Sequence, residues 1–129
     1  MASRDIDGVY VNRVIDVMFD NPTASEMGFL VEAYAKIGYY AASAESEAEL
    51  AEASRKMGQA DILLKYKQEN PKATAQMVDA YVTLSSAGLQ GTEDRARANA
   101  RKLKNLHESI EQAINAIKFL ERNGGVRIG

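Results

Sequence analysis

The chain has 129 residues, of which 46% are hydrophobic and 26% charged, a composition typical of one soluble folded domain rather than a disordered segment. It has no cysteine and a single histidine, His107, which excludes disulfides, cysteine nucleophiles and the usual zinc sites. Sixteen basic against eighteen acidic residues give a formal net charge of −2, so affinity for nucleic acid would require a local basic patch.

The first predicted element is a short helix near residues 5–20. Apolar residues recur there at helical spacing, at Ile6, Val9, Val14, Ile15 and Met18. The β-branched residues around Tyr10 leave a strand open as an alternative. Pro22 ends this element, so we expect residues 1–22 to form an N-terminal helix and loop.

A second, long helix is predicted over 24–69. Thr23 followed by Glu26 is typical of a capping box at its start, and no proline follows until Pro71. Gly38 and Gly58 are the points where this helix could kink or split. Two heptad seams of different phase follow each other along it: first Leu30, Tyr34, Ile37, Ala41, Ala44, Ala48 and Ala51, then Leu50, Ala53, Met57, Ala60 and Leu64. The phase change predicts a second partner or a local change of winding.

Two further helices are predicted near 72–87 and 93–122. Asn70 and Pro71 fit an N-cap followed by proline at the first helical position, and Gly88 and Gly91 bracket the end of the third helix. We expect Thr92 to cap the fourth helix and the Asn-Gly-Gly sequence at 123–125 to stop it. The prediction is an all-α single domain over 1–129, with a long antiparallel helical hairpin within 23–123 and a flexible tail at 124–129.

The heptad residues are expected to pack, either in the core of one chain or between copies in a homo-oligomer. Alanine at several seam positions, with Gly38 nearby, would let another helix approach closely. The strongest pattern in the chain lies in the fourth helix. The core or oligomer seam residues are Leu30, Tyr34, Ile37, Ala41, Ala44, Leu103, Leu106, Ile110 and Ile117.

Charge is segregated along the chain. Residues 20–52 hold seven acidic residues and one basic, whereas 55–72 and 91–104 each hold five basic residues and two acidic. If the third helix is a short return between two long ones, the two basic segments meet at one end, with Tyr66 available to stack on a nucleic-acid base. The alternatives are a solvated basic face and a core tyrosine. The candidate nucleic-acid-binding residues are Lys65, Tyr66, Lys67, Lys72, Arg95, Arg97, Arg101, Lys102 and Lys104.

Sequence motifs for catalysis are missing. No Gly-rich phosphate loop, H-E-x-x-H motif or nucleophile elbow occurs, so we expect no enzymatic activity and no cofactor. His107 follows a seam residue and is more readily explained by packing than by catalysis. The glutamates at 45, 47, 49 and 52 spread around a helix, which favours solvation over a metal site. No apolar run is long enough to span a membrane, so a cytoplasmic location is expected.

The order of these parts resembles that of small all-helical bacteriophage proteins, in particular the UvsY-type recombination mediators. The residues that carry the resemblance are the Tyr- and Ala-rich helix around 32–35, the Leu-Lys-Tyr-Lys sequence at 64–67, the stretch 72–82 and the final helix ending at 113–118. The resemblance implies an oligomeric, phage-encoded accessory factor in the host bacterial cytoplasm, which binds single-stranded DNA and helps to load a recombinase.

Two functions from different classes remain open. The first, which we take as the working hypothesis, is a recombination or replication accessory protein that holds single-stranded DNA on a basic end. The second is a non-enzymatic protein–protein interaction module with a phage or host partner, such as a structural part, an assembly factor or an inhibitor of a host defence protein.

Overall fold

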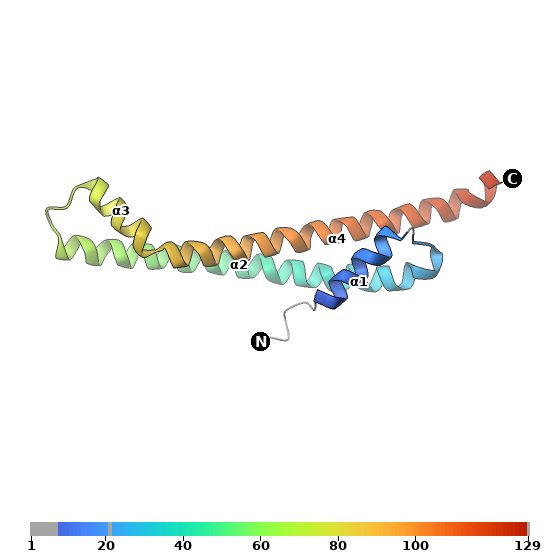
Figure 1. Ribbon diagram of the computed structural model, residues 1–129, viewed down its shortest axis with the longest axis horizontal. Coiled ribbons are helices and arrows are strands. Elements are labelled where there is room, and N and C mark those ends of the chain that lie inside the picture. The colour runs from blue at the N-terminus through green and yellow to red at the C-terminus, as the bar shows by residue number, and fades with distance from the viewer. Residues whose placement is uncertain (1–7, 21, 129) are drawn as a thin grey trace. The chain divides into compact units, whose positions relative to one another are not determined.

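The computed structural model describes residues 8–20 and 22–128, and within them every regular element is a helix (Figure 1). In chain order these are α1 (Gly8–Phe19), the short 3-10 helix η2 (Ala24–Glu26), α2 (Met27–Glu69), α3 (Ala75–Ser85) and α4 (Ala87–Ile128). The predicted all-α class, with two long helices packed on each other, is confirmed. The first residues of the helix predicted at 5–20, including Ile6, lie outside the described residues.

The chain forms two compact units, and the long helices α2 and α4 each contribute residues to both. Unit 1 comprises Met1–Ser43 and Arg101–Gly129, and unit 2 comprises Ala44–Ala100. Within unit 2 the partners of successive α2 residues move backwards along α4, from Arg97 opposite Glu52 to Glu93 opposite Arg55. The two helices are therefore antiparallel, as predicted.

Unit 1 has an apolar core built from three helices. Val14 of α1, Leu30 and Ile37 of α2, and Ile110 of α4 are fully buried together, with Ala33, Ile114 and Ile117 in the same cluster. These positions follow the helical period on each helix, so the apolar face of each helix meets the other two. Removing this surface from water is the main stabilising contribution to unit 1.

The start of α2 differs in detail from the predicted capping box. Thr23 caps the 3-10 helix η2, where its side chain accepts a hydrogen bond from the Ser25 backbone N–H at 3.3 Å. The Glu26 carboxylate accepts from the Thr23 hydroxyl at 2.9 Å, and hydrogen bonds from Ser25 and Thr23 lower the pKa of its carboxyl. The predicted cap residue is right, but the α-helix begins only at Met27.

The helix α2 is continuous, without a break at either glycine. A Cβ atom at Gly38 would lie 2.7 Å from His107 Nε2, and one at Gly58 would contact the Leu89 side chain. Both glycines therefore allow a side chain of α4 to approach the α2 backbone closely. The expectation that Gly38 permits a close helix approach is confirmed.

The predicted cap of α3 at Asn70 and Pro71 is wrong. Asn70 instead ends α2, since both its backbone N–H and its side-chain amide donate to the Tyr66 carbonyl. The true N-cap is Thr74, whose hydroxyl oxygen accepts from the Met77 backbone N–H at 3.2 Å. Asn70 was a poor guide because asparagine bonds to a preceding carbonyl as readily as it caps a following helix.

The predicted junction at Gly88, Gly91 and Thr92 is also wrong, because all three residues lie inside α4. The junction lies at Ser86, whose N–H bonds to the Val82 carbonyl and whose carbonyl accepts from the Gln90 N–H. Thr92 donates its hydroxyl to the Gly88 carbonyl, so its side chain is satisfied within the helix.

The predicted stop of α4 at residues 123–125 does not occur, since the helix continues to Ile128. The backbone of 124–128 is therefore helical where a flexible tail was predicted, and Gly129 lies outside the described residues. Glycine costs only about 1 kcal/mol relative to alanine inside a helix and, unlike proline, does not block the backbone sterically.

Candidate interaction surfaces of unit 2

The interface between α2 and α4 in unit 2 contains a network of charged and polar side chains. Arg55 and Glu93 form an ion pair with side chains 19% and 6% exposed, and Arg97 joins Glu93 at 3.0 Å and also pairs with Glu52. Arg55 Nη1 donates to Gln59 Oε1 at 2.9 Å, and Gln59 Nε2 donates to Ser86 Oγ at 3.1 Å. Charged and amide side chains thus link α2 to α4 where unit 1 has isoleucine and leucine.

The hydrogen bonds and ion pairs of this network stabilise the charged forms of its carboxylate and guanidinium groups. The hydrogen bond from Arg55 holds the pKa of the Glu93 carboxyl below its ordinary value. The pKa of Glu52 is lowered chiefly by its hydrogen bond with Lys56, at 2.8 Å, and the pKa of Arg97 is raised by Glu93. Arg97 therefore pairs with two carboxylates of the chain, while its side chain stays 42% exposed.

The first heptad seam continues through unit 2 in the same phase. Ala44 and Ala48 are buried, and the following seam positions are Ala51, Arg55, Gly58 and Ile62, none of which is fully exposed. No phase change therefore occurs in the packing of α2 against α4. Continuing the heptad past residue 51 gives arginine and glycine, a sequence signal for a polar, close interface that an apolar periodicity does not detect.

The second heptad seam is exposed instead. Leu50, Met57 and Leu64 recur every seven residues and are 68%, 70% and 59% exposed, with Ala53 and Ala60 exposed between them. Met57 follows the inward-facing Arg55 by two residues, about 200° around a helix of 3.6 residues per turn. This set of five residues, which we call the outer stripe, lies on the side of α2 opposite to α4.

The helix α3 also presents apolar side chains to solvent. Met77, Tyr81 and Leu84 share one face of α3 and are 53%, 45% and 78% exposed, while Val78 is buried. The Tyr81 ring stacks on the Tyr66 ring of α2, with centroids 4.3 Å apart and an angle of 21° between the planes. Tyr66 is half-buried, and its stack with Tyr81 covers one face of its ring.

Within unit 2, the predicted basic residues lie at different places along α2 and α4. Lys65 and Lys67 are exposed at the end of α2, and Lys72 is exposed in the connection to α3. Arg97 instead pairs with Glu52, which lies about 20 Å before Lys65 at 1.5 Å per helical residue. Arg97 does not reach Lys65 because α4 begins opposite Gly58, well before the end of α2.

The other predicted basic residues are exposed on α4. Arg95 belongs to unit 2, whereas Arg101, Lys102 and Lys104 belong to unit 1 and so lie in a different unit from Lys65. Only Lys65, Tyr66, Lys67 and Lys72 of the predicted set share one region of unit 2.

The predicted seam residues lie at helix contacts within the chain. Leu30, Ile37, Ala44, Leu103, Ile110 and Ile117 are buried, and Tyr34, Ala41 and Leu106 are half-buried. His107 stacks on Tyr34 with ring centroids 4.1 Å apart, which confirms a packing role for its ring. The six buried residues therefore belong to the core of the single chain.

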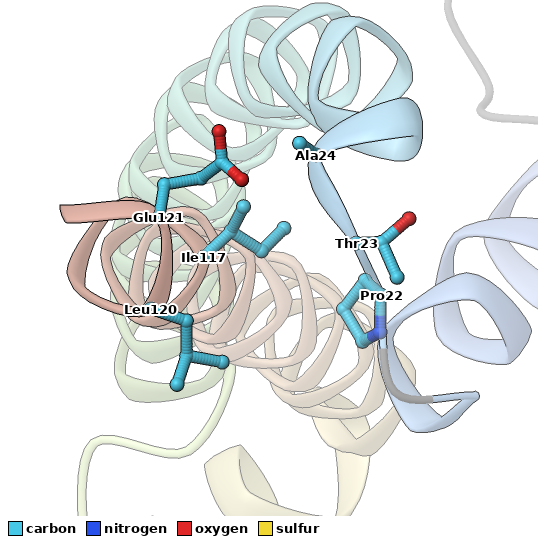
Figure 2. A pocket seen from close by; sticks show the side chains of 6 residues that line it. All are labelled: Pro22, Thr23, Ala24, Ile117, Leu120 and Glu121. Carbon is cyan, nitrogen blue, oxygen red and sulfur yellow. The ribbon is translucent and has the colours of Figure 1, made fainter. Parts of the chain in front are cut away.

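Unit 1 has a shallow pocket of about 220 Å³ beside the start of η2 (Figure 2). Pro22, Thr23 and Ala24 line one side, and Ile117, Leu120 and Glu121 of α4 line the other. Glu121 is the single ionisable side chain among these residues, so the pocket offers no acid–base pair.

Over the described part of the chain, no cluster of three or more histidine, aspartate or glutamate side chains has the geometry of a metal site. None of the described helices is long and apolar enough to cross a membrane.

The chain matches no protein family, and neither curated proteins nor solved structures give a significant match.

Proposed function

We propose that the protein is a non-enzymatic interaction module that assembles with another protein through unit 2. The observation that supports this function is the distribution of side chains in unit 2, where charged residues lie between α2 and α4 and the outer stripe faces solvent. An apolar stripe with a seven-residue repeat is the pattern that buries itself against another helix. Exposed contiguous apolar surface of this kind marks interaction sites in soluble proteins.

Site-specific photo-cross-linking tests this function. A photoreactive amino acid is placed at Met57, in the centre of the outer stripe, and at Asp94 as the control, since Asp94 is exposed on α4 of the same unit. Irradiation of producing cells is expected to give protein adducts from position 57 that are absent from position 94. Equal adducts from both positions, or none from position 57, would overturn the proposal.

Single-stranded DNA binding, the function suggested by the resemblance to recombination mediators, is a second candidate. It is favoured by Lys65, Lys67 and Lys72, which are exposed, carry no ion pair within the described residues and flank the Tyr66–Tyr81 stack. Fluorescence anisotropy with a labelled oligonucleotide tests it. The affinity should fall with salt at a slope of about −0.7 per phosphate contact, and replacing the three lysines with alanine should flatten the slope by about 2.

In the same assay, replacement of Arg97 is expected to leave the salt slope unchanged because its guanidinium is held by Glu52 and Glu93. No binding at low salt, or equal binding by the triple-lysine variant, would remove the DNA candidate and leave the interaction module.

A further inference from the structure

We infer that the outer stripe pairs with the outer stripe of a second copy of this chain, in an antiparallel two-fold arrangement centred between Met57 and Ala60. This inference rests on the proposed function and names its partner. Three features support it: the alternation of residue sizes along the stripe, the distribution of charge along α2, and the set of side chains left without ion pairs.

The sizes of the stripe residues are self-complementary in the antiparallel direction. Large residues at 50, 57 and 64 alternate with alanines at 53 and 60. Antiparallel pairing places Met57 opposite Ala60 and Leu64 opposite Ala53 of the other copy, so these two large side chains each meet a small one, while Leu50 lies opposite Lys67. Alternation of large and small side chains across an interface lets the layers interdigitate at an even helix separation. Parallel pairing would instead set large side chains against each other and alanine against alanine.

Charge along α2 and the connection that follows it selects the same direction. Glu45, Glu47 and Glu49 precede the stripe's centre, and Lys65, Lys67 and Lys72 follow it. In the antiparallel pair the acidic segment of each copy runs beside the basic segment of the other. In a parallel pair the glutamates would face one another, and like charges at such close positions disfavour association.

These charged side chains are available for a partner. All six are exposed, and none forms an ion pair within the described residues, unlike Glu52 and Lys56 of α2. Glu49 and Lys67 flank the stripe on the same side of α2, since they are 18 residues, or five helical turns, apart. Two-fold symmetry then makes the Glu49–Lys67 contact twice, once at each end of the stripe.

The absence of cysteine from the chain allows a clean test by disulfide trapping. Two variants of the full chain are made, Ala53→Cys and Leu64→Cys. Positions 53 and 64 of opposite copies should meet, whereas each position should lie about 16 Å along the helix from its own counterpart in the other copy. A disulfide needs Cα atoms within about 7 Å.

Under mild oxidation, each variant alone is therefore expected to stay monomeric on a non-reducing gel, and an equimolar mixture is expected to give a cross-linked dimer. A dimer from Ala53→Cys alone would indicate parallel pairing and overturn the inference. No dimer from the mixture would overturn it as well, provided that circular dichroism shows both variants to be folded.

Charge-exchange variants without introduced cysteines give an independent test. Glu49→Lys and Lys67→Glu should each raise the dimer dissociation constant by about tenfold, measured by sedimentation equilibrium, because each introduces two like-charge contacts. The double variant exchanges the two charges and should restore the affinity of the parent. Additive weakening in the double variant would contradict the Glu49–Lys67 contact.

The same measurements separate this inference from the proposed function. A parent chain that stays at 14.1 kDa at 100 µM, while position 57 cross-links to a different protein, removes the second copy as partner and retains the interaction module. A monomer without any adduct from position 57 removes both.

Discussion

Units 1 and 2 are built from the same two long helices, yet the space between these helices holds different side chains in each unit. In unit 1, Ile37 and Ile110 are fully buried between α2 and α4. In unit 2, the corresponding space holds Arg55 and Glu93, and Leu50 and Met57 lie on the outside of α2.

One helical hairpin can thus be held together mainly by apolar burial in one unit and by ion pairs in the other. Apolar burial in unit 1 contributes stability without a partner, at roughly 25 cal/mol per Å² of apolar surface removed from water. A charged interface contributes less, because the desolvation of its ions offsets much of their mutual attraction. Unit 2 therefore combines an ion-pair network between α2 and α4 with exposed apolar side chains on the outer stripe.

The largest expected effect of a substitution lies in the core of unit 1. Ile110→Ala should lower the free energy of unfolding by about 2–5 kcal/mol, because Ile110 is fully buried and its truncation leaves a cavity. Urea denaturation followed by circular dichroism measures this change. Phe119→Ala is the control on the same helix: its side chain is 62% exposed, and its replacement should change stability by less than about 0.5 kcal/mol. Equal effects would refute the assignment of the core.

Acid should destabilise unit 2 through Glu93. The folded-state pKa of Glu93 is lower than the ordinary value of 4.5, so its contribution to stability is present above pH 4.5 and lost as the pH falls through the folded-state value. Glu93→Gln removes this titration, and the variant should be less stable at pH 7 and lose less stability than the parent between pH 5 and pH 3.

The urea midpoint measured at each pH tests this prediction, with Glu108→Gln as the control. Glu108 lies on the same helix, is exposed and has no ion pair within the described residues. A Glu93→Gln variant with the same pH dependence as the parent would rule out the network as a pH-sensitive element.

Glycine substitutions compare close helix approach in the two units. Gly38→Ala should destabilise the protein by about 1–3 kcal/mol, because the new methyl group would displace the His107 ring from its stack on Tyr34. Gly58→Ala should cost less, since it meets only the end of the flexible Leu89 side chain and gains up to about 1 kcal/mol in helix propensity.

Gly88→Ala is the control for propensity alone, because a Cβ atom there has nothing within 4 Å. Thermal unfolding of the three variants gives the order. A Gly38→Ala protein as stable as Gly88→Ala would show that His107 moves aside without loss.

The smallest effect concerns the tyrosine stack of unit 2. A double-mutant cycle with Tyr66→Leu and Tyr81→Leu should give a coupling energy of about 0.5–1.5 kcal/mol for the stacked rings. The same cycle on Tyr66 and the distant Tyr39 serves as a reference that should show no coupling. A coupling energy near zero for Tyr66 and Tyr81 would mean that α3 is held on α2 by Val78 and other contacts instead.

The sequence predicted the number, type and order of the α-helices, because proline placement and a 3.6-residue apolar period act locally. It also identified the buried face of unit 1, where large apolar residues such as Ile37 and Ile110 leave no competing face. The helix boundaries at Asn70 and Thr92 could not be read in this way, since either side chain has two local hydrogen-bonding options of similar energy. Which option is taken depends on where α3 packs.

What the tertiary structure alone decided is which stripe of α2 faces inward in unit 2. By hydrophobicity, Leu50, Met57 and Leu64 are better core residues than Arg55, Gly58 and Gln59. The inward stripe is fixed by its partner helix: Glu93 neutralises Arg55, Ser86 accepts from Gln59, and Gly58 admits Leu89. Such pairing requires residues about 30 or 40 positions apart in the chain to meet. A local periodicity carries no information about these distant partners. A buried charge is tolerated only when its counter-charge comes from elsewhere in the fold, so the fold decides which stripe can face inward.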